Sequence, residues 1–102
     1  MYLKQPRHES EAWRRAVASL PCVCCMREGN TQAAHPNHRN KGMQIKSDDC
    51  WCVPLCVECH SEFDQGRKWT KQEKRQLMDE WIILTVRNLA LKGLVGPQSK
   101  TR

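Results

Sequence analysis

The sequence predicts a small α+β domain that is held together by zinc. Its 102 residues allow at most one compact domain, and since only 39% are hydrophobic and 6% aromatic, the apolar core is too thin to hold the fold without a further crosslink. Seven cysteines include two C-x2-C pairs, a spacing typical of structural zinc sites. The chain carries both helical and extended patterns. We expect one domain over residues 1–95, with its core at residues 20–67 and a flexible tail at residues 96–102.

The first predicted element is a short amphipathic helix over residues 11–20. Ser10 is a favourable N-cap residue, apolar side chains follow at helical spacing, and Pro21 ends the pattern. The polar face of this helix carries Arg14 and Arg15.

The middle of the chain is expected to form loops and short strands. Residues 22–46 are rich in Gly, Asn, Pro and charged residues and lack a helical apolar period. Residues 49–55 alternate in a way that predicts a strand, and Pro54 either makes it an edge strand or ends it. One face would carry Cys50, Cys52 and Pro54, and the other Trp51, Val53 and Leu55.

Two helices are predicted in the second half. The first covers residues 57–65 with Gly66 as its C-terminal cap, which places His60 and Asp64 one turn apart on the same face. The second covers residues 71–92 and begins with a capping-box pattern. Its buried stripe comprises Leu77, Met78, Trp81, Ile82, Thr85 and Leu89.

The long helix also carries more apolar surface than a small domain needs to bury. Residues 81–84 read Trp-Ile-Ile-Leu, so this surface is a candidate for homodimer formation or for a zinc-held protein-interaction module.

The cysteine pairs are the most specific signal in the sequence. Each C-x2-C pair delivers two thiolates from a tight turn, and two such pairs complete a tetrahedral site. Cys24 could replace one member of the first pair, and Cys50 and Cys52 fit the role of small buried hydrophobes. The predicted zinc ligands are Cys22, Cys25, Cys56 and Cys59.

The positive charge is concentrated in the last third of the chain. Residues 1–66 carry 8 basic and 8 acidic side chains, whereas residues 67–102 carry 9 and 3. This distribution favours a polyanionic partner, and DNA is the obvious candidate. The predicted contacts are Arg67, Lys68, Lys71, Lys74 and Arg75, although Arg75 could instead pair with Asp79.

Three of the four histidines lie within or beside the loop that the cysteine pairs close, in residues 33–39 and at position 60. A strand with a histidine, a second strand and a helix that opens with Cys-x2-Cys-His resembles the HNH, or ββα-metal, nuclease motif. The chain is similar to small phage and prophage HNH proteins at Ala34-His35, residues 42–46, Asp48-Asp49, residues 54–60 and residues 64–66.

This resemblance implies a ββα-metal domain with flanking N- and C-terminal helices, and a metal-dependent endonuclease that hydrolyses DNA in phage recombination or DNA processing. It makes His35 the general base. His60 would bind a catalytic divalent cation (Mg²⁺, Mn²⁺ or Zn²⁺), and Asp64 would complete or orient that site. Asp49 would take the place of the middle Asn of the motif, for which Asn37 and Asn40 are alternatives.

One departure from the family pattern leaves two arrangements open. Many members carry a metal ligand directly before the base, where this chain has Ala34. Either Asp64 supplies the missing oxygen, or His35 is a ligand and His38 is the base. The same departure supports an alternative function, a catalytically inactive zinc-stabilised protein that binds DNA or assists recombination.

The expected partners are DNA, contacted also by Arg39 and Lys46, and a host or phage recombination protein. No stretch has the length and apolarity of a membrane span, and residues 1–15 are too charged for a signal peptide. We therefore expect the protein in the cytoplasm of a bacterial host.

Overall fold

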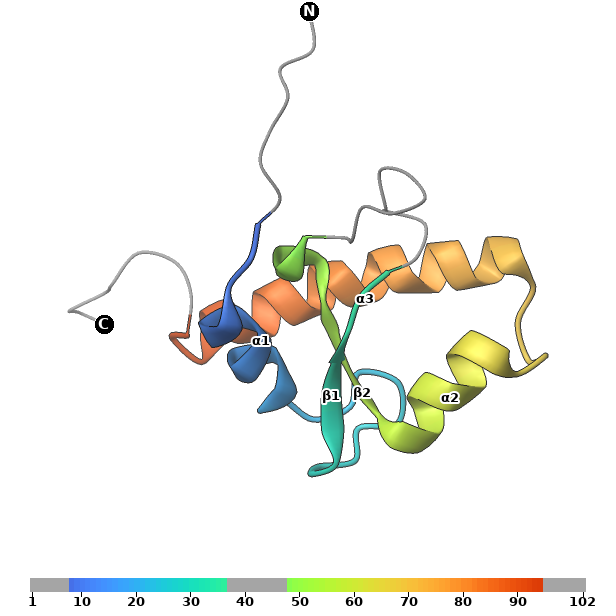
Figure 1. Cartoon of the computed structure of the whole chain (residues 1–102), viewed down its shortest axis with the longest axis horizontal. Coiled ribbons are helices and arrows are strands. Elements are labelled where there is room, and N and C mark those ends of the chain that lie inside the picture. Colours follow the sequence, from blue (N-terminus) through green and yellow to red (C-terminus); the bar gives the residue numbers. More distant parts are fainter. Residues whose placement is uncertain (1–7, 37–47, 95–102) are drawn as a thin grey trace, which may run out of the picture.

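The computed structural model describes residues 8–36 and 48–94. The elements are, in order, α1 (Glu11–Ala18), β1 (Thr31–Ala34), a 3-10 helix η2 (Asp49–Trp51), β2 (Val53–Cys56), α2 (Val57–Gln65) and α3 (Lys71–Leu91). The two strands cross the middle of the molecule between α1 and α2, and α3 extends past both (Figure 1). This confirms the predicted α+β class. None of the described helices combines the length and apolar character needed to cross a bilayer.

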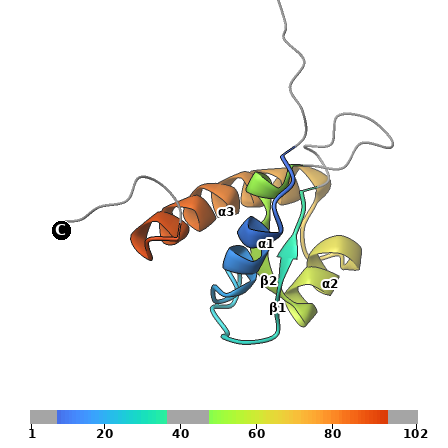
Figure 2. The same cartoon turned by 60° about the vertical axis from the view of Figure 1, so that its left-hand side comes forward.

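β1 and β2 form an antiparallel pair whose faces are covered by different helices. All four residues of β2 are buried. Val53 and Leu55 pack in a cluster with residues of α2 and α3, whereas Cys52 joins a second cluster with Val17 and Leu20 near α1. The strands therefore lie between α1 and α2, with α3 alongside them (Figure 2). α3 contributes to both clusters, because its Leu89 belongs to the one near α1.

α1 begins where the sequence predicts and ends two residues earlier. The Ser10 hydroxyl accepts a hydrogen bond from the Trp13 N–H at 3.0 Å, which satisfies one of the free donors at the helix start. The helix stops at Ala18, and the N–H of Ser19 closes the last turn.

The predicted strand over residues 49–55 is wrong in its first half. Residues Asp49–Trp51 form a 3-10 turn, closed by a 3.1 Å hydrogen bond from the Cys52 N–H to the Asp49 carbonyl, and the strand begins only at Val53. The reason lies outside the segment, since the Asp49 carboxylate is held by the Ser10 N–H at 2.7 Å. Asp49 therefore precedes the second strand instead of opening it.

α2 has the predicted bounds, and Gly66 follows it as predicted. Gly66 has φ of −77°, a conformation open to any residue, so it is not a left-handed cap. Glycine is needed because a Cβ at this position would collide with the side chain and the carbonyl oxygen of Glu62.

α3 carries the predicted capping box, in which Thr70 and Glu73 exchange side-chain to backbone hydrogen bonds. Its described span ends at Leu91, one residue earlier than predicted. The predicted stripe is buried except for Leu77, which is half-buried. Of residues 81–84, the first two are buried and Ile83 and Leu84 are exposed, so homodimer formation through this helix stays a prediction.

Two further expectations lie outside the described residues. These are the flexible tail at residues 96–102 and the loop positions Asn37, His38, Arg39, Asn40 and Lys46.

Candidate functional site

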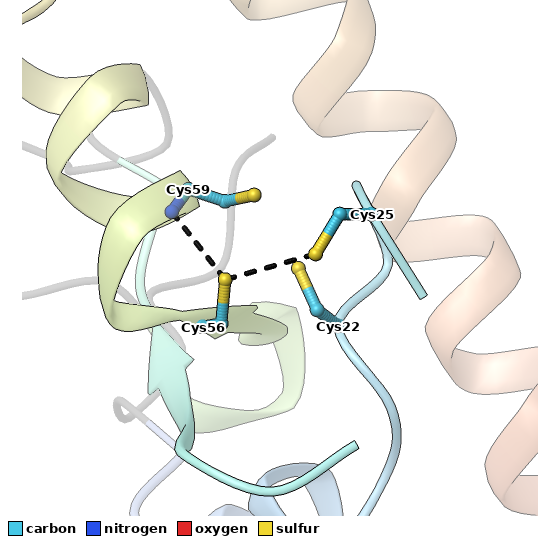
Figure 3. A group of neighbouring side chains, drawn as sticks. All are labelled: Cys22, Cys25, Cys56 and Cys59. Atoms are coloured by element: carbon cyan, nitrogen blue, oxygen red, sulfur yellow. Dashed lines mark hydrogen bonds between the residues drawn. The ribbon is translucent and has the colours of Figure 1, made fainter. Parts of the chain in front are cut away.

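The four predicted zinc ligands come together in space (Figure 3). The sulfur atoms of Cys22, Cys25, Cys56 and Cys59 all lie within 4.8 Å of one another, and those of Cys25 and Cys56 are 3.8 Å apart. A tetrahedral zinc with bonds of about 2.3 Å holds its sulfurs about 3.8 Å apart. The group could therefore hold a metal such as zinc.

Two backbone segments place these sulfurs. The first pair lies on a turn after α1, in which the Met26 N–H donates to the Cys22 carbonyl at 2.8 Å and Met26 has φ of 67°. A 2.8 Å hydrogen bond from the Val23 N–H to the Pro54 carbonyl joins this turn to β2. The second pair lies at the β2–α2 junction, where the Cys56 sulfur accepts the Cys59 N–H.

Cys24 is not part of this group and packs against the larger core cluster instead. The C-x2-C spacing thus identified the two cysteines of this segment that lie in the group.

The thiols of this group differ in acidity. Burial opposes ionisation of Cys22, but backbone N–H groups, chiefly those of Cys25 and Cys56, lower its pKa to about 7. Burial first, and then the neighbouring thiols, raise the pKa of Cys59. A divalent cation among the sulfurs would favour the thiolate form at every position.

A second group of predicted residues meets where β1 ends. His35 follows β1, and its Nε2 lies 2.8 Å from Oδ1 of the fully buried Asp49. Burial raises the pKa of Asp49, but hydrogen bonds from the Ser10 N–H, His35 and Arg14 together lower it to about 2. Because an ionised carboxylate only accepts hydrogen bonds, Nε2 carries the proton and Nδ1 carries the free electron pair of the neutral ring.

Sequence reasoning missed the part that α1 plays in this group. Arg14 donates to Asp49 Oδ2 across a separation of 35 residues, and Ser10 donates its N–H to the same oxygen. The sequence shows only that Arg14 lies on a polar helix face, which carries no information about a distant partner.

The predicted pair of His60 and Asp64 also forms. His60 Nε2 lies 3.2 Å from Asp64 Oδ2, and His60 Nδ1 donates to Oε1 of Gln32, a residue that sequence reasoning missed, at 2.9 Å. With the proton of a neutral ring on Nδ1, the electron pair of Nε2 faces a carboxylate oxygen. A second proton or a divalent cation between these two atoms would stabilise the arrangement.

A pocket of about 400 Å³ lies between the His35–Asp49 pair and the His60–Asp64 pair, and is lined by one residue of each. His60 does not line this pocket, but its partner Asp64 does. Three of the predicted DNA contacts, Lys71, Lys74 and Arg75, are called the pocket cations below. The lining comprises His35, Phe63, Asp64, the pocket cations and Met78.

Two further predicted DNA contacts lie in the segment between α2 and α3. Arg67 and Lys68 are exposed, and the Lys68 ammonium lies 4.9 Å from the centre of the Trp69 ring. Trp69 itself packs against Phe63 and Trp81, which supports a packing role for this residue.

Fold and site together define a small α+β protein with four cysteines placed to bind a metal. A family model described as "Protein of unknown function (DUF968)" matches residues 1–91, and the chain belongs to this family. No curated protein matches the chain, and no solved structure does. Family membership assigns no activity, so the function has to be argued from the site.

Proposed function

We propose that the protein is a metal-dependent endonuclease of the HNH type that hydrolyses DNA phosphodiester bonds during phage recombination or DNA processing. One observation carries this proposal. His35, held through Nε2 by a buried carboxylate, lines the same pocket as the three pocket cations. A base that is oriented beside several positive charges is suited to the hydrolysis of an anionic ester.

The order of elements supports the HNH type. β1, β2 and α2 follow one another along the chain, with His35 directly after the first strand and His60 on the helix. The four-cysteine group would act as a structural zinc site, because it joins the turn after α1 to the start of α2. Bound zinc would thereby stabilise the helix that carries His60.

Each group of residues has its own role in the proposed reaction. His35 Nδ1 accepts a proton from the attacking water, and the charge of Asp49 stabilises the imidazolium that forms. The pocket cations hold the phosphate and offset its growing negative charge. His60 and Asp64 would hold a divalent cation, which when bound stabilises the pentacovalent phosphate and the leaving 3′ oxygen.

One observation favours a second candidate, a zinc-stabilised protein that binds DNA or assists recombination without cutting it. Ala34 occupies the position at which many HNH proteins carry a further metal ligand, and it is 2% exposed within the core. The pocket cations alone would be sufficient for binding to phosphates.

A plasmid-nicking assay separates the two functions. Zinc-loaded protein is dialysed free of other divalent ions and incubated with supercoiled plasmid, with and without Mg²⁺ or Mn²⁺. Omitting the cation is a better control than adding EDTA, because a chelator could also strip the structural site and unfold the protein. The nuclease proposal expects nicked plasmid only with added cation, whereas retarded but intact plasmid under all conditions would favour the accessory protein.

A further inference from the structure

A third group of potential metal ligands lies beside the start of β2, apart from the four cysteines. One nitrogen of His35, one carboxylate oxygen of Asp49 and the sulfur of Cys52 all lie within 4.8 Å of one another. Asp49 and Cys52 are 0% and 1% exposed. The His35 side chain is 34% exposed, so the group can be reached from solvent through this residue.

The backbone accounts for this convergence. In a 3-10 turn the side chains of residues i and i+3 lie above one another, and the turn closed between Asp49 and Cys52 therefore places both on one side. The antiparallel pairing ends with Ala34 opposite Val53, and His35 and Cys52 are the next residues of the two segments beyond this pair. The strand predicted from sequence would instead have put Asp49 and Cys52 on opposite faces.

The three ligand types are those that zinc prefers. Imidazole nitrogen, carboxylate oxygen and thiolate sulfur all bind Zn²⁺, and three protein ligands with one open position are typical of sites whose fourth ligand exchanges. The Ser10 N–H and Arg14 hold Oδ2 of Asp49, which leaves Oδ1 directed at His35. Such outer hydrogen bonds orient ligating carboxylates in metal sites.

We propose that His35, Asp49 and Cys52 form a further metal site, for one exchangeable divalent cation of borderline softness such as Zn²⁺ or Co²⁺. On binding, the Cys52 thiol releases its proton to solvent and the His35 proton moves from Nε2 to Nδ1. The cation then takes the Nε2 electron pair, the Asp49 oxygen and the thiolate. His35 Nδ1 is now protonated, so a bound cation also stops His35 from acting as a base. This last consequence rests on the proposed function, whereas the metal site itself does not.

The test is a titration with Co²⁺ of protein that holds one equivalent of Zn²⁺ in the four-cysteine site and has been dialysed free of exchangeable ions, with the zinc content measured first. Binding is followed through the absorption band of the Co²⁺–thiolate bond. A tetrahedral set of four thiolates selects zinc, so the four-cysteine site keeps its zinc during the titration. We expect the band to grow to one equivalent of Co²⁺ per chain. Cys52→Ala should abolish it, and Cys50→Ala, which removes a nearby cysteine outside the group, should leave it unchanged.

Two further variants make the titration decisive. His35→Ala should weaken Co²⁺ binding by at least about tenfold, since the loss of even an outer partner of a metal ligand costs about 10- to 100-fold. His60→Ala should leave the band unchanged, because the pair of His60 and Asp64 contains no sulfur. If Cys52→Ala does not fold, the Co²⁺ affinity of His35→Ala decides the question, because His35 is partly exposed and its replacement disturbs the core less.

Three outcomes would overturn the proposal: no band in the parental protein, a band retained in folded Cys52→Ala, or unchanged affinity in His35→Ala. None of these measurements uses DNA cleavage, so the metal site and the nuclease activity can fail independently.

Discussion

Replacing one cysteine at a time tests whether the four-cysteine group holds a structural metal. Cys25 is exposed, so Cys25→Ala removes a sulfur from the group with almost no loss of packing. Cys24, its neighbour, is half-buried against the larger core cluster but lies outside the group. Packing alone therefore predicts that Cys24→Ala is the more damaging change, and metal binding predicts the reverse.

The expected difference is large enough to measure. Structural zinc contributes about 10 to 16 kcal/mol in small zinc-dependent domains, or about 3 kcal/mol for each of four ligands. For a domain of this size, 1 kcal/mol corresponds to a change in Tm of about 4 to 8 °C. Cys25→Ala should therefore lower the Tm by about 12 to 24 °C. Cys24→Ala should lower the free energy of unfolding by about 1 kcal/mol and the Tm by about 4 to 8 °C.

Thermal melts followed by far-UV circular dichroism, with the zinc content measured on the same samples, supply both readouts. We expect about one tightly bound zinc per chain in the parental protein and in Cys24→Ala, and a large loss in Cys25→Ala. The reasoning is refuted if Cys24→Ala is the less stable variant, or if metal-free parental protein melts cooperatively at the same temperature as the zinc-loaded form.

Three further predictions follow from the described contacts. The pKa of Asp49 is about 2 in the folded protein against an ordinary value of 3.8, so its ionised form adds about 2 kcal/mol to the free energy of unfolding. This contribution is complete above pH 4 and is lost as the pH falls through 2. Urea unfolding of Asp49→Asn and parental protein should show this difference in pH dependence, whereas parallel curves would contradict it. Reversing the pocket cations to Glu should weaken DNA binding and reduce the slope of log K against log salt by up to about 3. The control reverses Arg87, on the far half of α3, and Lys92, which follows its last residue; equal effects would show that the pocket cations are not specific DNA contacts. Gly66→Ala should destabilise the protein by about 1 to 3 kcal/mol because the new Cβ meets Glu62, and an unchanged midpoint of chemical unfolding would speak against that contact.

The features that sequence reasoning found are those encoded by neighbouring residues. The capping box at Thr70 and the one-turn spacing of His60 and Asp64 depend on positions three or four residues apart. The cysteine pairs belong to this kind too, since each pair forms within one tight turn. Their meeting across 30 intervening residues could be inferred because four thiolates complete one metal site.

The features that sequence reasoning missed depend on contacts between distant segments. Alternation made residues 49–55 look like a strand, but the hydrogen bonds from Ser10 and Arg14 to Asp49 accompany a 3-10 turn at its start. Cys52 is the small buried residue that the sequence predicts. Its place beside His35 follows from the turn and from the register between β1 and β2, and neither can be read from local pattern.

The proposed function depends most directly on His35 as the base, and plasmid cleavage by His35→Ala tests it. The comparison uses the parental protein, His38→Ala and the exposed control His8→Ala, all zinc-loaded, at the same Mg²⁺ or Mn²⁺ concentration and with DNA binding measured in parallel. We predict that His35→Ala folds and binds DNA but cleaves about 10² to 10⁴ times more slowly, while His8→Ala cleaves at the parental rate and His38→Ala is affected much less than His35→Ala. Cleavage by His35→Ala at the parental rate would contradict the assignment, and an inactive His38→Ala beside it would transfer the role of base to His38.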